Sequence, residues 1–410
     1  MNNFKQFLRY IGKYSKYIDY PLVVTYVILC LTSIIMVYSA SMVAATKGTL
    51  TNGTPVSGTY FYTRQLLYVI VSMGLVFFMA FFMNVKILQT LKFQKIMMLV
   101  MVGLLVATLL IGSNINGSKS WIHLGFMNLQ ASEFLKIALV LYLSFMIEKK
   151  RPRVFREPKV LMSPLILTGI CVALVLLQRD VGQTLLILMV VFAVILYAGV
   201  GIEKILKYGF IILFGIVLVG GLFLLLGAFP DYLAARFSTF TNPFNSESGT
   251  GYHVSNSLLA IGNGGLLGRG LGNSVLKLGY LPEPHTDFIF AIICEELGLI
   301  GGLFVICLLF FIVYKAFVLA NKTTSYFKLV CVGVASYIGS QTFVNLGGIS
   351  GTIPLTGVPL PFISFGGSSM ISLSIAMGLL LITAKQIKID EARKKQAQKH
   401  QRNIDIPRRY

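Results

Sequence analysis

The sequence is short of charge, and of acids above all. Only 12% of its 410 residues are charged and only 15 are Asp or Glu, whereas 56% are hydrophobic. A soluble domain carries about 25% charged residues. The composition therefore excludes an ordinary soluble globular protein and indicates a chain embedded in a membrane, for which counting domains by length does not apply.

The sequence also lacks the patterns of disulfide, metal and nucleotide sites. Its five cysteines lie inside apolar runs and none is paired in a CxxC motif, so we expect small core residues. The glycine cluster at 262–272 is followed by no Gly-Lys-Ser/Thr, and Leu267 stands where a dinucleotide fingerprint needs its third glycine. The cluster then predicts either simple turns or a loop whose backbone approaches a ligand closely.

Nucleic acid is excluded by where the positive charge lies. The formal net charge is +20, but the basic residues gather near 5–16, at 149–156 and at 385–409, beside apolar runs. This is typical of cytoplasmic loops and ends of membrane proteins, which contact anionic lipid, and no nucleic-acid-binding motif accompanies it. Residues 1–20 alternate apolar and basic residues at helical spacing, which favours a helix on the cytoplasmic leaflet over a frayed terminus. We find no cleavage site of a secretory leader, so the first apolar run is expected to be an anchor.

Long apolar runs are what the chain has in abundance. A membrane-spanning helix needs about 20 mostly apolar residues. The sequence predicts an all-α polytopic membrane protein with a ten-helix domain over 21–386 and both termini in the cytoplasm. A large extracellular loop is expected at 229–287, between helices 7 and 8, and a basic cytoplasmic tail at 387–410. The predicted spans lie near 21–44, 65–84, 95–112, 131–147, 164–178, 184–200, 208–228, 288–318, 328–348 and 365–386.

Two charges stand inside the fourth apolar run. Glu133 and Lys136 are three residues apart, so they lie on one helix face. Charged side chains in a membrane are costly, face a bundle interior and often carry function. They are either a structural ion pair that locks two helices or part of a substrate site, where Lys136 would neutralise a phosphate.

Asp287 is the candidate catalytic residue. Pro282 and Pro284 restrict the chain before it, His285 and Thr286 can hydrogen-bond neighbouring groups, and an apolar helix follows. Asp287 is either an ordinary N-cap of that helix or a general base at the membrane face. Glu295 and Glu296, deeper in the same helix, would raise its pKa, and the helix N-terminus would lower it.

Further candidate substrate contacts lie in the predicted outer loops. Trp121 is the single Trp of the chain and serves either as an interface anchor or as a sugar-stacking residue. Asp180 forms either a local ion pair with Arg179 or part of the site.

The turn between the fifth and sixth runs, 179–183, is either a tight hairpin or a re-entrant break. The stretch 354–369 has backbone N–H groups that could bind an anion, or it packs as a stiff loop. The remaining candidates are Lys119, Gln130, Arg236, Arg269 and Ser368.

These motifs together resemble one family, the shape, elongation, division and sporulation glycosyltransferases that polymerise peptidoglycan. The matching stretches are Ser39–Ser41, Lys119–Ile122, Gln130–Lys136, Gln178–Asp180, Gly251–His253, Ala260–Ser274, Leu281–Phe290 and Gly357–Ser369. They extend over 21–386, and the division member is the nearest match, with the elongation member as rival. The chain departs from the family at Lys119, Arg179 and Phe365, where the family often has Arg, Pro and Tyr.

The resemblance implies a function and partners. It implies an enzyme, an inverting glycosyltransferase that uses undecaprenyl-pyrophosphate-linked lipid II as donor and a lipid-linked glycan as acceptor. It also implies that the family's essential Asp is Asp287 and that its paired Glu and Lys are Glu133 and Lys136. It implies a separate class B penicillin-binding protein as transpeptidase partner, other division proteins and a septal location. Whether a divalent cation, Mg²⁺ or Mn²⁺, takes part in the reaction stays open. The alternative function is a lipid II flippase or transporter, which needs the buried pair but no base.

Overall fold

The structure is a computed structural model that describes residues 2–51, 53–115, 117–125, 127–151, 158–199, 250–323 and 325–405. The predicted seventh span, 208–228, and the candidate residue Arg236 lie outside these ranges. Within them the chain is mostly helical, as its composition predicts.

Each of the other nine predicted spans coincides with a helix. These helices are α2 (Tyr20–Thr46), α3 (Tyr60–Phe82), α5 (Leu91–Ile111), α6 (Ala131–Lys149), α8 (Met162–Leu177), α9 (Val181–Tyr197), α13 (Ile289–Lys322), α14 (Ser325–Ile349) and α15 (Gly367–Asp405). In the described ranges six helices are long and apolar enough to cross a membrane, and α8 and α9 are shorter apolar helices. The count of ten spans stays a prediction.

The centre of the bundle is formed by α15 and α14. In its most apolar window 89% of the residues of α15 are buried, against 28% for α13 and for α5. Because lipid is as apolar as the protein core, a helix at the lipid surface can be apolar on every face. Buried polar side chains, rather than apolar ones, therefore distinguish the inner helices from the outer ones. α6 also belongs to the centre, since fourteen of its side chains are buried. The polar side chains on these inner helices are therefore the ones that must bind one another.

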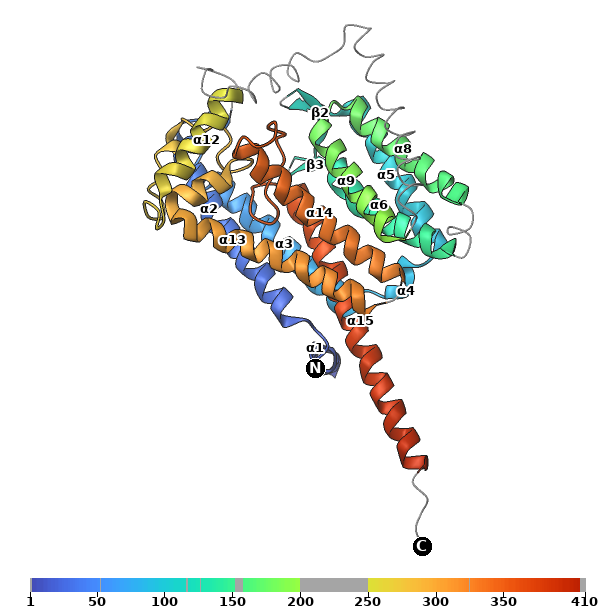
Figure 1. Ribbon diagram of the computed structural model, residues 1–410. Coiled ribbons are helices and arrows are strands. Elements are labelled where there is room, and N and C mark those ends of the chain that lie inside the picture. Colours follow the sequence, from blue (N-terminus) through green and yellow to red (C-terminus); the bar gives the residue numbers. More distant parts are fainter. Residues whose placement is uncertain are drawn as a thin grey trace.

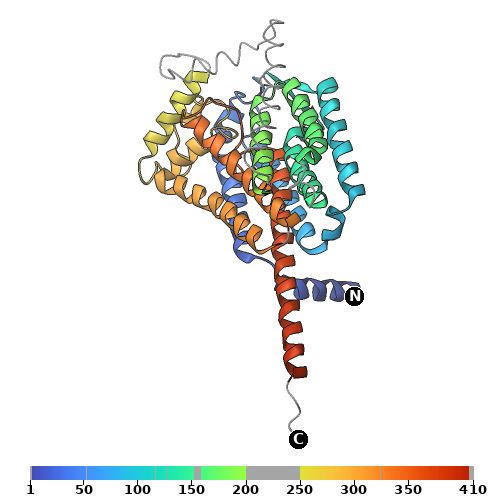
Figure 2. The same ribbon diagram turned by 45° about the vertical axis from the view of Figure 1, so that its right-hand side comes forward.

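Both ends of the described chain lie at one end of the bundle. The N-terminal helix α1 (Asn2–Ser15) lies across that end, crosswise to the projecting last turns of α15 (Figure 2). The loop between α14 and α15 and the strand β2 lie at the opposite end (Figure 1). The predicted N-terminal helix is present over Asn2–Ser15, and its place on the cytoplasmic leaflet stays a prediction. α15 continues as a helix through most of the predicted tail.

Two expected loops have structure of their own. Residues 113–130 form a small antiparallel sheet of β1 (Ser113–Ile115), β2 (Ser118–His123) and β3 (Asn128–Gln130), so the all-α prediction misses one element. The large loop contains α12 (Thr250–Gly264), which packs along α13, and a short 3₁₀ helix at Leu276–Leu278. The break at 179–183 is a tight turn that joins α8 directly to α9.

A sharp kink divides α13. Gly298 has φ +68° inside the helix, and Phe290 lies beside Gly302 although twelve residues separate them. Gly268 comes so close to this kink that a Cβ on it would lie 2.3 Å from the carbonyl oxygen of Glu296. Only glycine fits both positions, because a side chain would clash or be strained. The glycine-rich segment, defined here as residues 262–278, therefore packs against α13.

Candidate functional site

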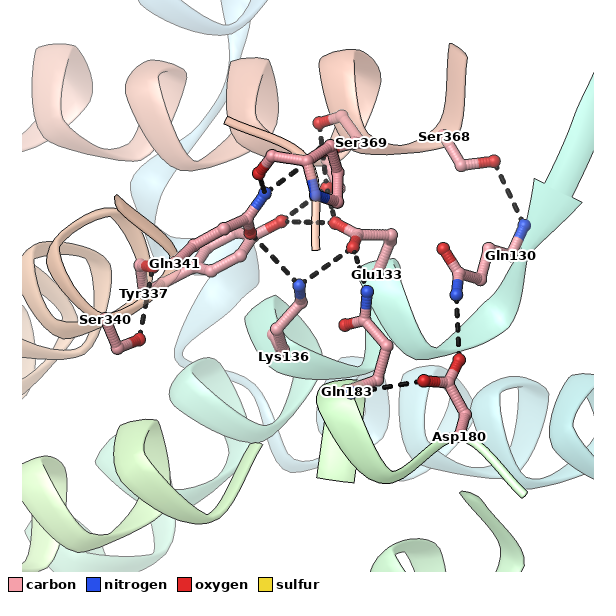
Figure 3. Close-up of polar contacts among 12 residues, drawn as sticks. Gln130, Glu133, Lys136, Asp180, Gln183, Tyr337, Ser340, Gln341, Ser368 and Ser369 are labelled. Carbon is pink, nitrogen blue, oxygen red and sulfur yellow. Dashed lines mark hydrogen bonds and ion pairs between the residues drawn. The ribbon is translucent and has the colours of Figure 1, made fainter. Parts of the chain in front are cut away.

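Two fully buried charges, Glu133 and Lys136, lie in a polar cluster between α6, α9, α14 and α15. Lys136 Nζ lies 2.9 Å from Glu133 Oε1, and both side chains are fully buried (Figure 3). Burial removes both ions from solvent, so the pair is tolerated only if further hydrogen bonds complete it. The sequence therefore predicted correctly that this pair faces the bundle interior.

Three neighbouring helices supply the hydrogen bonds that complete Glu133. Gln183 Nε2 donates to Oε1 at 2.7 Å, and the hydroxyls of Tyr337 and Ser372 donate to Oε2 at 2.8 and 3.2 Å. Lys136 lies over the Tyr337 ring, 4.5 Å from its centroid. Its Nζ also donates to Gln341 Oε1 at 3.2 Å. Because Lys136 is enclosed on all sides, it is in no position to neutralise a substrate phosphate in this conformation.

A second polar group lies beside the cluster, at the end of α9. Asp180 is the N-cap of α9 and accepts from Gln183 N at 3.2 Å. Its other oxygen accepts from Gln130 Nε2 at 2.9 Å, and Ser120 also hydrogen-bonds it. Burial raises the pKa of the Asp180 carboxyl, and these hydrogen bonds oppose the rise. Asp180 thus ties the sheet and α6 to α9.

The sheet presents the remaining candidates of this group. Lys119 is exposed and its Nζ donates to Leu110 O at 3.2 Å. Trp121 is half-buried and pairs with Ser113 and Gln130 across the sheet. Ser368, at the start of α15, accepts from Gln130 N at 3.0 Å and donates to Asn128 O at 2.7 Å. Ser368 therefore binds protein rather than presenting a free hydroxyl.

Asp287 lies in the turn that precedes α13. The helix begins at Ile289 with Phe288 as its N-cap, so the alternative that Asp287 is an ordinary N-cap of this helix is wrong. Its side chain is half-buried, and a Cβ built on Gly357 would lie 3.4 Å from Oδ2. The carboxylate is thus in contact with the loop between α14 and α15, at the end of the bundle opposite the termini (Figure 1).

The two residues before Asp287 are held in place. His285 is buried between Phe61 and Phe365, with ring centroids at 4.4 and 5.3 Å. Burial lowers the pKa of His285 to about 3, so the ring is neutral at neutral pH. Thr286 Oγ1 donates to the carbonyl oxygen of Glu283 at 3.1 Å and to its carboxylate at 3.0 Å. Both residues serve to shape the turn.

The acids expected to act on Asp287 bind other groups. Glu296 pairs with buried Lys277 at 2.6 Å and accepts from Ser39 Oγ at 2.7 Å. Glu295 accepts from Ser274 Oγ and lies 3.8 Å from Arg269. The two carboxylates hold the glycine-rich segment to α13, and Lys277 and Arg269 of that segment supply the cations that pair with them.

An apolar groove of about 310 Å³ lies beside the kink of α13. Its walls come from α12, α13 and α14, and two hydroxyls, those of Ser350 and Thr352, lie at its edge. Phe290 lines it one turn after Asp287. The groove can hold an aliphatic chain.

The ligand set of a protein-bound divalent cation is not assembled here: no three His, Cys, Asp or Glu side chains gather in the part of the chain that the structure describes. Mg²⁺ is commonly held by one or two carboxylates together with substrate phosphates. Within the described residues no set of side chains stands ready to hold a metal without substrate.

Sequence reasoning missed Lys277, Tyr337, Gln341 and Asn345. All four are buried and polar or charged, and three of them stand in the apolar helix α14. Gln and Asn in a predicted span must find partners, since lipid offers none. Gln341 and Asn345 inside the ninth apolar run were therefore the signal in the sequence that a polar site lies on this helix.

Comparisons with known proteins agree with this architecture. The family model of the FtsW, RodA and SpoVE cell cycle proteins matches residues 20–389. The protein named "Probable peptidoglycan glycosyltransferase FtsW" in Bacillus subtilis is 38% identical over 93% of this chain and 94% of its own length. Its namesake in Enterococcus hirae is 36% identical over 91% and 94%.

Solved structures share the fold. The rod shape determining protein RodA of Thermus thermophilus is 26% identical, with a TM-score of 0.61 over 90% of this chain and 97% of that one. A chain of a peptidoglycan synthase complex that coordinates polymerization and crosslinking has a TM-score of 0.68 at 24% identity, over 90% and 98%. On the match over nearly its whole length, the chain belongs to the FtsW, RodA and SpoVE family of cell cycle proteins.

Proposed function

We propose that this protein polymerises lipid II into glycan strands at the outer face of the bacterial cytoplasmic membrane, with Asp287 as its general base. The observation that carries the proposal is the match to relatives named as peptidoglycan glycosyltransferases, over more than nine-tenths of this chain and of theirs. These relatives are FtsW proteins and the family model is described as a cell cycle protein, which favours division over elongation.

The proposed topology has ten spans, with 208–228 as the seventh and both termini in the cytoplasm. Two observations support it: both ends of the described chain lie at one end of the bundle (Figure 1), and the basic residues gather beside those ends. The loop that contacts Asp287 then faces outward, where the lipid-linked sugars are polymerised.

The proposed reaction is a single displacement. The 4-hydroxyl of the acceptor sugar attacks the anomeric carbon of the donor, and Asp287 accepts the hydroxyl proton. The bond from that carbon to undecaprenyl pyrophosphate breaks, the pyrophosphate leaves with the electron pair, and the anomeric configuration inverts. A positioned general base contributes about 10²–10⁴-fold to such a rate.

Among the candidate cations, Lys119 is the one best suited to the leaving pyrophosphate. It is exposed, whereas Lys136 is enclosed beside Glu133 and Arg269 lies near Glu295. A cation at the departing phosphate stabilises the charge that develops in the transition state. Arg236 lies outside the described residues and stays a candidate. Trp121, Gln130 and Asp180 then form the wall of the site on the Lys119 side.

The apolar groove supports a lipid-linked substrate. It begins one helical turn after Asp287 and its lining is almost wholly apolar. We assign to it the polyprenyl chain of one substrate, whose sugar would then lie at Asp287. The proposed partners are a class B penicillin-binding protein transpeptidase and further division proteins at the septum, and the synthase complex among the similar structures supports the transpeptidase.

Asp287→Asn tests the proposal. The full-length variant is purified, reconstituted with its transpeptidase partner and given lipid II, and glycan strands are resolved on gels. We expect folding and insertion as in the wild type and a loss of polymerisation of about 10²–10⁴-fold. Glu283→Gln is the matched control, because it removes the other carboxylate of the same turn, and it should keep activity within about 3-fold.

Full activity of Asp287→Asn would refute Asp287 as the base. Wild-type protein that moves lipid II across liposome membranes but forms no strands would favour a flippase instead and overturn the polymerase itself.

A further inference from the structure

The fully buried ion pair and the carboxylate proposed as base are linked by two amide side chains. Gln341 and Asn345 are four residues apart on α14, so they lie on one face of the helix. Gln341 is fully buried and Asn345 is 4% exposed. Amides this deep in an apolar helix are costly unless each finds partners.

Asn345 holds the backbone of the Asp287 turn. Its Nδ2 donates to the carbonyl oxygen of Asp287 at 2.9 Å and to that of Val358 at 2.8 Å. The two preceding carbonyls of the turn are held in the same way. Phe365 N donates to His285 O at 2.9 Å, and Ser364 Oγ donates to Thr286 O at 2.6 Å.

Gln341 holds the other side of the same loop. Its Nε2 donates to Pro359 O at 2.9 Å. Pro359 directly follows Val358, whose carbonyl oxygen Asn345 binds. Its Oε1 accepts from Lys136 Nζ at 3.2 Å (Figure 3). A continuous series of contacts thus runs from the buried ion pair through Gln341 and the loop to Asn345 and Asp287.

The chemistry of the partners fixes each amide. A lysine ammonium can only donate and a carbonyl oxygen can only accept, so Gln341 must present its oxygen to Lys136 and its nitrogen to Pro359. Asn345 must turn its nitrogen to two carbonyls, which a carboxylate could not do. Its Oδ1 is buried and accepts from no donor within the described part of the chain.

We infer that Gln341 and Asn345 are positioning residues through which the Glu133–Lys136 pair fixes the Asp287 carboxylate against Gly357. This inference depends on the proposed role of Asp287 as the base. It assigns Glu133 and Lys136 an action through the loop rather than contact with substrate. A base displaced by about 1 Å can lose about 10²-fold in rate, so small changes at these amides should reach the reaction.

Two substitutions test the inference on the full-length protein with its partner. Asn345→Leu keeps the approximate volume and removes both donated bonds. Gln341→Glu keeps an acceptor for Lys136 but turns an oxygen toward Pro359 O. We expect kcat on lipid II to fall about 10- to 100-fold for each, with KM within about 3-fold, because the substrate contacts are intact. Thr342→Val is the control, since the Thr342 hydroxyl donates to Ile338 O of its own helix and, among the described residues, to no group of the Asp287 turn or its loop.

A merely structural role gives a different result. It would lower the melting temperature while kcat per folded molecule stayed near that of the wild type, and that outcome overturns the inference. If Asn345→Leu does not fold, Gln341→Glu decides by the same measurements. Asp287→Asn is measured in parallel: if it is active, the proposed function fails, and if it is inactive while both amide variants keep the wild-type kcat, this inference alone fails.

Discussion

Two buried lysine–glutamate pairs in this protein differ in what surrounds them. Lys136–Glu133 is completed by side chains from three other helices, among them Gln183, Tyr337 and Gln341. Lys277–Glu296 is completed by Ser39 and by backbone groups of the glycine-rich segment, such as the Gly272 amide at 3.0 Å. The first pair binds side chains of three other helices, whereas the second holds the glycine-rich segment to α13 and, within the described ranges, hydrogen-bonds α2 through Ser39 alone.

The difference separates two uses of the same chemistry. Backbone groups have no alternative position, so a pair bound to them stabilises one local structure. Side chains on separate helices can connect the pair to another site through further hydrogen bonds, as Gln341 does by donating to the loop beside Asp287. Burial alone therefore does not identify a functional pair, and the partners of the pair have to be known.

The largest effect on stability is expected from Lys277→Met. It leaves the Glu296 carboxylate buried without its cation, and breaking a buried pair in this way costs about 3–5 kcal/mol. Denaturant titration of the purified protein measures it. The activity of the molecules that remain folded should stay within about 3-fold of the wild type.

Lys277→Met combined with Glu296→Gln is the control for that prediction. It removes both charges and keeps an acceptor for the Gly272 amide, so it should recover most of the lost stability. A double variant as unstable as the single one would mean that the lysine acts through packing rather than charge.

The corresponding double variant of the other pair should act on the reaction. Glu133→Gln with Lys136→Met leaves no unpaired buried charge, so the protein should fold. Gln341 loses its donor, and we expect polymerisation to fall about 10- to 100-fold through misplacement of Asp287. Strand synthesis by the two double variants, measured side by side at equal folded concentration, makes the comparison. Equal activity of both would remove the distinction between the pairs.

The sequence predicted the helices well because apolar length is a local property. The described spans begin and end close to the predicted boundaries, except that α15 continues to Asp405, well beyond the predicted end at 386. The break before Val181 was found as well. The kink at Gly298 was missed because it depends on contact with Gly268, thirty residues away. The small sheet was missed because its strands are only three to six residues long.

The site was predictable only residue by residue. Glu133 and Lys136 stood out because charge in an apolar run is costly. Glu295 and Glu296 stood out equally, yet their partners lie in the glycine-rich segment. No periodicity within α13 could assign a carboxylate to one partner or the other, since that choice depends on how distant segments meet.

A further effect on stability should depend on pH. The pKa of His285 is about 3 in the folded protein and about 6.5 when unfolded, so the unfolded chain binds the additional proton below about pH 6.5. Stability is then fully present above pH 6.5 and falls by up to about 1.4 kcal/mol per pH unit as the pH drops toward 3. Melting temperature against pH measures it. His285→Leu should flatten that slope, whereas His123→Gln, at an exposed histidine, should leave it unchanged.

The smallest effect is expected in the groove. Ile306→Trp adds bulk to its wall, far along α13 from Asp287, so it should hinder the polyprenyl chain without touching the reacting groups. We expect KM for lipid II with a long polyprenyl chain to rise about 3- to 10-fold, since each buried methylene is worth about 0.8 kcal/mol, and kcat to stay unchanged. Phe310→Trp, on the exposed face of the same helix, is the control. A short-chain lipid II analogue should be nearly insensitive to Ile306→Trp, and equal losses for both chain lengths would show that the groove does not hold the tail.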